Sequence, residues 1–370
     1  MGSLLPWLSL KSVPGLTNQA YLGLLEHFGS PSAVLEAPAA DLVKAKAVST
    51  KLADAIARHS CPGWVYAELE AVEKQNYTIL TLDDPGYPRL LRHIADPPPV
   101  LYVRGKLCPR QPSVAVVGSR KATSYGLNAA RKIAGGLAEH GWTIVSGMAL
   151  GIDSAAHKAA LAAGKETIAV LGTGLDVIYP RQNAKLYNEI AESGALVSEF
   201  FLDTEPRGHH FPVRNRIISG LCYGTVVVEA ARRSGALITA RLALEQGRDV
   251  FAVPGSIESP SSRGTNFLIR QGAHLVENAD QVTAELADQL DCGLVRTTPE
   301  VKSGTGKKTD VVELSAAERK ILDLIGAEPV HIDEIAVKTD AGTGELASIL
   351  LHLELKGAVV QRPGKFFQRP

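Results

Sequence analysis

The residues of this 370-residue chain that most clearly suggest chemistry are arginines in glycine-rich or aromatic surroundings. Arg120 ends the run VAVVGSR, and Arg214 and Arg216 flank Asn215 in the block HHFPVRNRIISG. Phe211 lies in the same block and is followed by a proline, which favours its exposure. A guanidinium group can bind phosphate oxygens through two parallel hydrogen bonds, and an aromatic ring offers a stacking face. These residues therefore indicate a phosphate site with an aromatic surface beside it.

The first of these arginines follows a predicted strand and precedes a predicted helix. Val114–Val117 is a short apolar run, and Leu127–Glu139 is an amphipathic segment. A strand that is apolar on both faces is typical of a parallel sheet covered by helices on both sides. Such sheets bind ligands beyond the carboxyl ends of their strands, where helix N-termini offer free N–H groups. Gly118, Ser119 and Arg120 are thus placed to hold a phosphate.

The middle of the chain alternates strand and helix patterns from Ser113 to about Leu290. The predicted strands are Val114–Val117, Thr143–Ser146, Thr167–Leu171, Ala195–Ser198, Thr225–Val228, Val250–Val253 and Ala273–Val276. Two half-buried strands, Thr78–Leu82 and Val100–Val103, come before them in a proline-rich stretch. This alternation predicts an α/β fold with a doubly wound parallel sheet. Several strands end in glycine and small polar residues, which would leave backbone donors facing one crevice.

Residues 1–76 predict a small all-α module in front of the sheet. In this region an apolar stripe ends at Gly29, and Ser30 caps the helix that follows. The stretch is similar to helix-hairpin-helix and sterile-alpha-motif modules, some of which bind DNA phosphates. Lysine and arginine are sparse around the turn, so a packing or docking role is favoured over DNA binding.

Two further regions follow residues 77–290, the predicted sheet domain. Residues 291–310 are polar and lack periodicity, which predicts a linker. Residues 311–370 predict a winged helix, whose third helix, Glu345–Leu355, would be the one that reads a DNA duplex. That helix carries two glutamates and a histidine, and a basic residue comes only after its end. A protein contact or packing role is therefore favoured over duplex reading.

Composition sets outer limits on the function. Lys plus Arg and Asp plus Glu both total 39, so any anion site must be local. The four cysteines form no short pair, which argues against a zinc ribbon or a disulfide framework and predicts a reducing, cytoplasmic environment. No segment has the length and apolarity of a membrane span, and the first residues do not form a signal sequence. We therefore expect no membrane partner.

The motifs of common enzymes with this fold are missing. A dinucleotide site needs an acid at the end of the second strand, but that strand ends in Ser146 and Gly147. A Walker phosphate loop is also missing. Glu229 and Asp153 are the acids embedded in the motifs, without a nucleophile, a paired carboxylate or a metal cluster. We therefore expect no catalysis, no cofactor and no metal, and a structural role for His157.

The central domain resembles the DprA (Smf, DNA-processing protein A) family. The resemblance rests on the blocks VVGSR, SGMALGIDSAAH, LGTGLDVIYP, FPVRNRIISG, VVVEAARRSGALITARLALEQGRDVFAVPG and GTNFLIRQGA, in that order. It implies an extended Rossmann-like domain in a homodimer that binds single-stranded DNA during natural transformation, protects it and helps to load the recombinase RecA. Carried over block by block, it implies the DNA-binding residues Gly118, Ser119, Arg120, Gly174, Phe211, Arg214, Asn215 and Arg216. Arg207 is included as a further basic contact, although that region varies in the family.

A related fold supplies an alternative function. Nucleotide hydrolases of the phosphoribohydrolase type bind and cleave a nucleoside monophosphate through a glycine-rich loop followed by a threonine and a glutamate. Gly224, Thr225 and Glu229 resemble that motif faintly, because the leading Pro-Gly-Gly is missing. The motifs favour binding of a single strand over hydrolysis.

Overall fold

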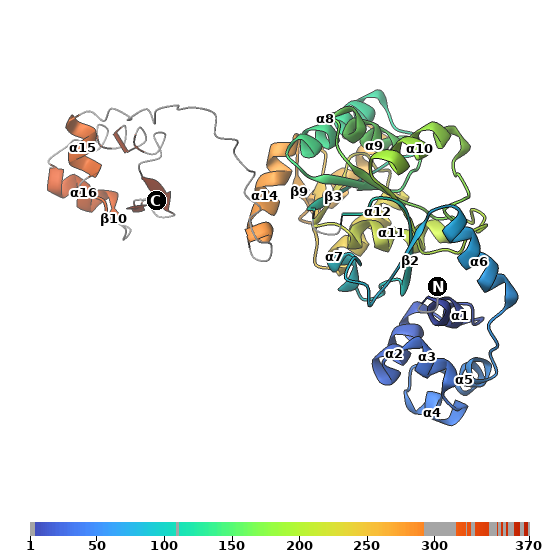
Figure 1. Cartoon of the computed structure of the whole chain (residues 1–370). Helices are drawn as coiled ribbons and strands as arrows, with labels where there is room; N and C mark the ends of the chain where they lie inside the picture. Colours follow the sequence, from blue (N-terminus) through green and yellow to red (C-terminus); the bar gives the residue numbers. More distant parts are fainter. Residues whose placement is uncertain are drawn as a thin grey trace, which may run out of the picture. The chain divides into compact units, whose positions relative to one another are not determined.

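The computed structural model describes residues 4–108 and 111–291, and parts of the last region: 316–322, 324–326, 330–339, 346, 349–350, 353, 359–362 and 366–368. The chain divides into two compact units, Met1–Arg296 and Thr297–Pro370 (Figure 1). No helix among the described residues is both long and apolar enough to span a bilayer.

The first unit begins with six short helices, which Figure 1 shows gathered beside strand β2 (Val100–Gly105). They are α1 (Leu5–Lys11), α2 (Asn18–Phe28), α3 (Pro31–Glu36), α4 (Ala39–Lys44), α5 (Thr50–Ala57) and α6 (Gly63–Lys74). The predicted boundary between two of them is confirmed. Gly29 ends α2 with a φ of 80°, a conformation that suits glycine, and the Ser30 hydroxyl accepts a hydrogen bond from Ala33 N at 3.3 Å.

The rest of this unit is built on a nine-stranded sheet. Besides β2, its strands are β1 (Thr78–Thr81), β3 (Ser113–Val117), β4 (Thr143–Ser146), β5 (Thr167–Val170), β6 (Ala195–Ser198), β7 (Gly224–Val227), β8 (Asp249–Ala252) and β9 (His274–Leu275). Their order is β1-β2-β6-β5-β4-β3-β7-β8-β9. The seven strands from β3 to β9 pair in parallel, whereas β2 pairs antiparallel with both β1 and β6. The predicted α/β class and all nine predicted strands are confirmed, with ends that differ by at most two residues.

Helices cover both faces of the sheet because its strands are apolar on both faces. Their bounds are α7 (Arg89–Arg92), α8 (Ser124–Glu139), α9 (Ile152–Ala162), α10 (Ala184–Ser193), α11 (His210–Gly220), α12 (Gly235–Glu245), α13 (Arg263–Arg270) and α14 (Ala279–Asp291). Along β3, Val114 and Val116 pack in the core formed with α8, α9 and α14. Ala115 and Val117 pack in the opposite core, formed with α7, α11 and α12. Each face thus has its own apolar layer.

The strand order reverses between β3 and β7. From β3 the chain adds β4, β5 and β6 on one side, and it then returns to place β7 on the other side of β3. The helices that follow these two strands, α8 and α12, pack on opposite faces. A crevice therefore opens at the carboxyl ends of β3 and β7, which is where open α/β sheets bind their ligands.

The N-terminal helices share a hydrophobic core with the sheet. Trp7, Leu24 and Leu69 belong to the same buried cluster as Tyr102 of β2. Glu68 also accepts a hydrogen bond from Leu202 N at 2.9 Å across this boundary. The helices and the sheet therefore pack as one body.

The second unit has the features of a winged helix. It contains α15 (Ala316–Leu322), α16 (Ile332–Thr339) and a three-stranded sheet in the order β10-β12-β11. Strand β10 is Val330–His331, and β11 (Val360–Arg362) pairs antiparallel with β12 (Phe366–Gln368) as the predicted wing. The predicted third helix, Glu345–Leu355, lies largely outside the described residues, as does the predicted linker. Leu346, Leu350 and Leu353 join the core of this unit.

Candidate nucleic-acid interface

A pocket of about 530 Å³ lies at the carboxyl ends of β3 and β7, in the crevice where the strand order reverses. Six of the nine predicted site residues line it: Gly118, Ser119, Arg120, Phe211, Arg214 and Asn215. The wall also includes Lys121, Asp153, Arg233, Ser234 and Gly235. Four cations and one carboxylate therefore line the pocket, a balance that favours an anionic ligand.

The turn after β3 is close-packed, and this explains its glycine. A Cβ atom on Gly118 would lie 2.6 Å from the Ile152 side chain and 3.0 Å from the Glu229 carbonyl oxygen. Glu229 also fixes the start of α8, because its carboxylate accepts hydrogen bonds from Thr123 N at 2.9 Å and from the Thr123 hydroxyl at 2.8 Å. The turn thus presents Ser119 and Arg120 to the pocket from a rigid support.

Arg214 forms part of the pocket wall, although its side chain is almost entirely buried. It is 4% exposed, and its Nη1 donates to the Gly147 carbonyl at 2.8 Å and to the Val170 carbonyl. Its Nε donates to Asn215 Oδ1 at 3.2 Å. Burial lowers the pKa of Arg214 to about 10, although nearby Asp153 opposes that shift. The group therefore stays charged at neutral pH, and no described carboxylate forms an ion pair with it.

Asp153 also holds the backbone at this edge of the sheet. Its Oδ2 accepts hydrogen bonds from Gly147 N at 3.2 Å and from Ala149 N at 3.4 Å. Asp153 lies in the first turn of α9, whose N-cap residue is Gly151. Burial raises the pKa of Asp153, and the charge of Arg214 opposes the rise. This carboxylate thus stabilises the loop after β4.

Phe211 is the aromatic centre of the site. The Arg120 guanidinium carbon lies 5.3 Å from the centre of its ring, and that of Arg214 lies 5.8 Å away. A second ring, that of Tyr179, has its centre 5.5 Å from the centre of the Phe211 ring. A Cβ atom on Gly172 would lie 2.8 Å from the Phe211 ring, so this glycine lets the ring lie against the end of β5. Two guanidinium groups and the Tyr179 ring therefore lie close to the Phe211 ring.

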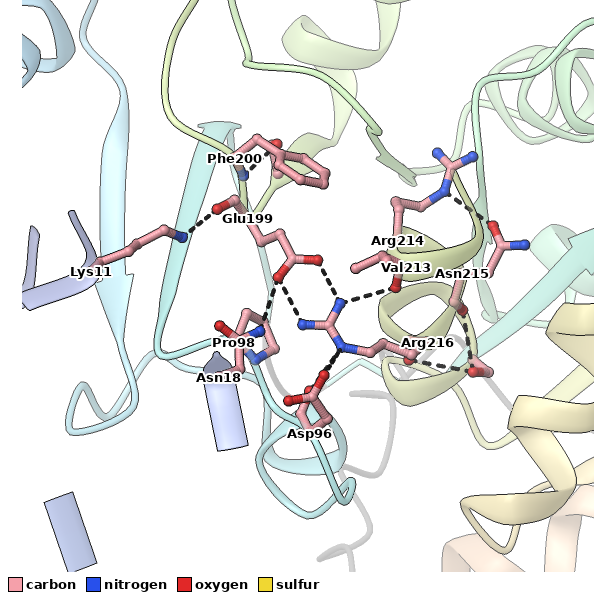
Figure 2. Close-up of polar contacts among 12 residues, drawn as sticks. Lys11, Asn18, Asp96, Pro98, Glu199, Phe200, Val213, Arg214, Asn215 and Arg216 are labelled. Carbon is pink, nitrogen blue, oxygen red and sulfur yellow. Dashed lines mark hydrogen bonds and ion pairs between the residues drawn. The ribbon is translucent and has the colours of Figure 1, made fainter. Parts of the chain in front are cut away.

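The structure does not bring Arg216 into this pocket. Arg216 is 6% exposed, and its guanidinium forms a bidentate ion pair with Glu199, at 2.5 Å and 2.7 Å, and a contact with Asp96 Oδ2 at 2.8 Å. Figure 2 shows Arg214 and Arg216 leaving α11 in different directions. Glu199 also accepts a hydrogen bond from Asn18 Nδ2 at 3.2 Å, and its carbonyl accepts one from Lys11 Nζ. Arg216 thus connects α11 with the N-terminal helices.

Gly174 and Arg207 do not line the pocket either. A Cβ atom on Gly174 would lie 2.6 Å from the Phe201 carbonyl oxygen, so the glycine permits close packing of two loops. Arg207 is exposed in the segment before α11. The structure therefore gives Gly174 a packing role and leaves Arg207 at the surface.

Sequence reasoning did not select Lys121, Arg233 or Ser234 for the site. Lys121 directly follows Arg120, and Arg233 precedes the turn into α12, where Ser234 caps the helix by accepting a hydrogen bond from Ala236 N at 3.3 Å. The Ser-Gly turn after β7 was a usable signal. It places a second helix N-terminus at the same crevice as the first.

His157 has the structural position expected for it. It is fully buried, its Nδ1 lies 2.8 Å from the Thr167 hydroxyl, and burial lowers its pKa to about 3. No group of three or more His, Cys, Asp or Glu side chains among the described residues could hold a metal ion.

An open, mostly parallel sheet with a cationic and aromatic crevice at its switch point defines a Rossmann-like protein, in a class whose members use this crevice for phosphorylated ligands. Residues 78–287 match the family model of DNA recombination-mediator protein A, and residues 306–365 match the DprA winged helix domain. The chain belongs to this family, as its sequence blocks predicted.

Individual relatives agree with this assignment. The chain is 40% identical over 327 residues to Protein Smf of Synechocystis, covering 81% of this chain and 82% of that protein. It is 48% identical over 214 residues to DNA processing protein DprA of Streptococcus pneumoniae, covering 58% and 76%. The crystal structure of the S. pneumoniae protein superposes with a TM-score of 0.66, at 40% identity, covering 75% of this chain and 96% of that one. The structure of DNA processing protein A from Helicobacter pylori, described for its single-stranded DNA binding mode, matches with a TM-score of 0.52 at 33% identity. The match covers 58% of this chain and 96% of that one.

Proposed function

We propose that this protein binds single-stranded DNA through the pocket at β3 and β7, as a DNA-processing protein of natural transformation. The observation that carries the proposal is the meeting of Arg120 and Arg214 at the Phe211 ring. Non-specific single-strand sites combine a cationic path for the backbone with aromatic faces for the bases. Lys121 and Arg233 add two further cations to the lining of the pocket.

A single strand suits this arrangement better than a duplex. Phe211 and Tyr179 lie beside a recessed pocket, and the bases of a duplex are already stacked and paired. A strand whose bases can turn outward reaches the rings without that cost. Fluorescence anisotropy with single-stranded and duplex DNA of equal length, at two salt concentrations, tests the proposal. We expect the single strand to bind at least about tenfold more tightly, or about 1.4 kcal/mol, and equal affinities would contradict it.

Binding without hydrolysis fits the positions of the acids. Glu229 would be the catalytic residue of a phosphoribohydrolase, but both of its oxygens accept hydrogen bonds from Thr123. Asp153 is buried and holds two backbone N–H groups. Neither carboxylate is available to act on a ligand in the pocket. Release of free base from a nucleoside monophosphate would reverse this assignment in favour of the hydrolase.

A homodimer is part of the proposal, and the edge of the sheet supports it. Strand β9 ends the sheet beyond β8, and its residue Leu275 is exposed. Phe267 of α13 and Ile257, which is 86% exposed, also present apolar surface in this part of the chain. An exposed strand edge with apolar side chains is a ready surface for a second copy. Light scattering of the parent and a Leu275→Lys variant tests this, with a dimer expected only for the parent.

Protection of the bound strand and its transfer to RecA complete the proposed role. This part rests on the family resemblance alone. A strand-exchange assay with RecA and a single-strand-binding competitor measures it, and we expect faster RecA filament formation when this protein is added. No acceleration would restrict the role to binding.

A further inference from the structure

An exposed aromatic ring lies at the same edge of the sheet as the pocket, but outside its lining. Tyr125 belongs to the first turn of α8, is 54% exposed and does not line the pocket. Its hydroxyl donates a hydrogen bond of 2.7 Å to the carbonyl oxygen of Pro254, in the chain that follows β8. The bond holds the side chain in one orientation. Because the polar end is engaged, the exposed surface of Tyr125 is mainly ring.

The segments around this ring are tied to one another and to the pocket. Gly255 N donates to Asn266 Oδ1 at 3.3 Å, and its carbonyl accepts a hydrogen bond from Asn266 Nδ2 at 3.0 Å. Gly264 N, at the start of the same helix α13, donates to the Ala230 carbonyl at 2.7 Å, in the chain after β7. Strands β3, β7 and β8 are neighbours in the sheet. Their carboxyl ends therefore form one connected surface that includes both the pocket and Tyr125.

Cations occur in the segments that join the pocket to this ring. Lys121 lines the pocket and precedes Tyr125 by four residues. Arg232 is exposed, and both of its neighbours in the chain line the pocket. The chain from Val253 to Arg263 has one acid, Glu258, and ends in a cation. A polyanion that leaves the pocket on this side thus meets cations and an exposed ring, and no excess of negative charge.

We propose that Tyr125 is a second stacking platform, for a base of the same single strand beyond the pocket, and that Arg232 contacts a phosphate next to it. This inference rests on the proposed single-strand binding. Single-strand sites extend over several nucleotides and combine cations along the backbone with exposed rings on which bases stack. The paired bases of a duplex could not reach such a ring. On this path the strand crosses the carboxyl ends of β3, β7 and β8.

Anisotropy titrations of the full-length protein with oligo-dT of increasing length, from about four to about sixteen nucleotides, test the platform. Tyr125→Leu should weaken binding of the longest strand at least about fivefold, the contribution of one stacked base. The shortest strand, which occupies only the pocket, should bind this variant like the parent. Tyr125→Phe keeps the ring and loses the hydrogen bond to Pro254, and it should bind every length like the parent.

Tyr66→Leu is the matched control for the ring. Tyr66 is exposed to a similar extent on α6, 50% against 54%, and does not line the pocket, so its loss should change affinity at no length. For the phosphate contact, Arg232→Gln should make the slope of log K against log salt shallower by about 0.7 on the longest strand only. Arg131→Gln, at an exposed position further along α8, should leave the slope unchanged at every length.

The outcomes separate this inference from the proposed function. Parent-like binding of the longest strand by Tyr125→Leu would overturn the platform and keep single-strand binding in the pocket. An equal loss for the shortest and longest strands would also overturn it, because Tyr125 would then act within the pocket. A loss in Tyr125→Phe as large as in Tyr125→Leu would overturn it too, since the hydrogen bond and not the ring would be what matters. If the parent bound single strands no more tightly than duplex, the proposed function would fail, and the platform with it.

Discussion

Helix α11 carries two buried arginines, two residues apart, with opposite environments. Arg216 faces Glu199 and Asp96, so two carboxylates balance its charge. Arg214 faces the carbonyl oxygens of Gly147 and Val170, which accept hydrogen bonds from its Nη1 but leave its charge in place. Burial cannot distinguish these residues, since they are 4% and 6% exposed. Their partners do distinguish them. The ion pairs of Arg216 stabilise the fold, whereas Arg214 contributes an unbalanced charge to the candidate site.

The carboxylates beside the two arginines show the same contrast. Burial alone would raise the pKa of Glu199, but the hydrogen bonds and charge of Arg216, with help from Lys11, hold it below its usual 4.5. The pKa of Asp153 is raised, because burial outweighs the attraction of Arg214. A bidentate ion pair thus stabilises Glu199 as an anion, whereas Asp153 has no such partner. The positive charge near Phe211 is consequently left for a ligand.

The largest expected effect comes from breaking the Arg216 ion pairs. Arg216→Met should lower the free energy of unfolding by about 3–5 kcal/mol, because it leaves Glu199 buried without its partner. Single-strand affinity of the folded variant should stay within about threefold, or roughly 0.7 kcal/mol, of the parent. Thermal denaturation and anisotropy measure the two quantities.

Arg241→Met is the control for that experiment. Arg241 pairs with Glu245 at 3.5 Å, and both side chains are exposed. Exposed pairs of this kind contribute about 0.5 kcal/mol or less. If Arg216→Met instead melted like the parent and bound DNA poorly, Arg216 would belong to the site and the contrast on α11 would fail.

Removing Arg120 should have the opposite effect: DNA affinity should fall while stability stays nearly unchanged. Arg120→Ala should weaken single-strand binding by about 1.5–3 kcal/mol, as expected for a lost charge-assisted hydrogen bond. The slope of log K against log salt should become shallower by about 0.7, the share of one phosphate on a single strand. Stability should barely change, because the side chain is exposed at the pocket.

Arg131→Ala provides the matched control on α8. Arg131 is exposed and does not line the pocket, and its nearest partner is Asn128 at 2.7 Å. Its loss should leave both affinity and salt dependence unchanged. A parent-like affinity for Arg120→Ala combined with a melting temperature several degrees lower would make Arg120 a structural residue.

A milder effect is expected from acid, which acts on the same ion pair without removing Arg216. Glu199 has a folded pKa below its unfolded value, so its contribution to stability is present above about pH 4.5 and is lost as the pH falls through the folded pKa. Melting temperatures of the parent and Glu199→Gln between neutral pH and pH 3 measure this. The parent should lose stability more steeply than the variant below pH 4.5, and parallel curves would contradict it.

The sequence predicted the sheet and the first turn well, because both depend on local patterns. β-branched runs mark the strands, and Gly118 marks a turn with no room for a Cβ atom. The role of Arg216 could not be read in this way. Its partners Glu199 and Asp96 lie 17 and 120 residues away in the chain, and Lys11 lies 188 residues from Glu199. From the sequence alone, Arg216 therefore resembled a site residue, because it lies in the same block as Phe211 and its carboxylate partners are distant in the chain.

The smallest effect is expected from removing the winged helix. Every residue that lines the pocket belongs to the first unit, Met1–Arg296, whereas the winged helix has a core of its own around Ile335 and Leu353. The segment predicted as its third helix, Glu345–Leu355, carries acidic residues that repel phosphate. Deleting residues 311–370 should therefore change single-strand affinity by less than about tenfold, or 1.4 kcal/mol. A larger loss in the same anisotropy assay would mean that the second unit contributes a DNA contact of its own, and the contrast between Arg214 and Arg216 would then describe only part of the binding surface.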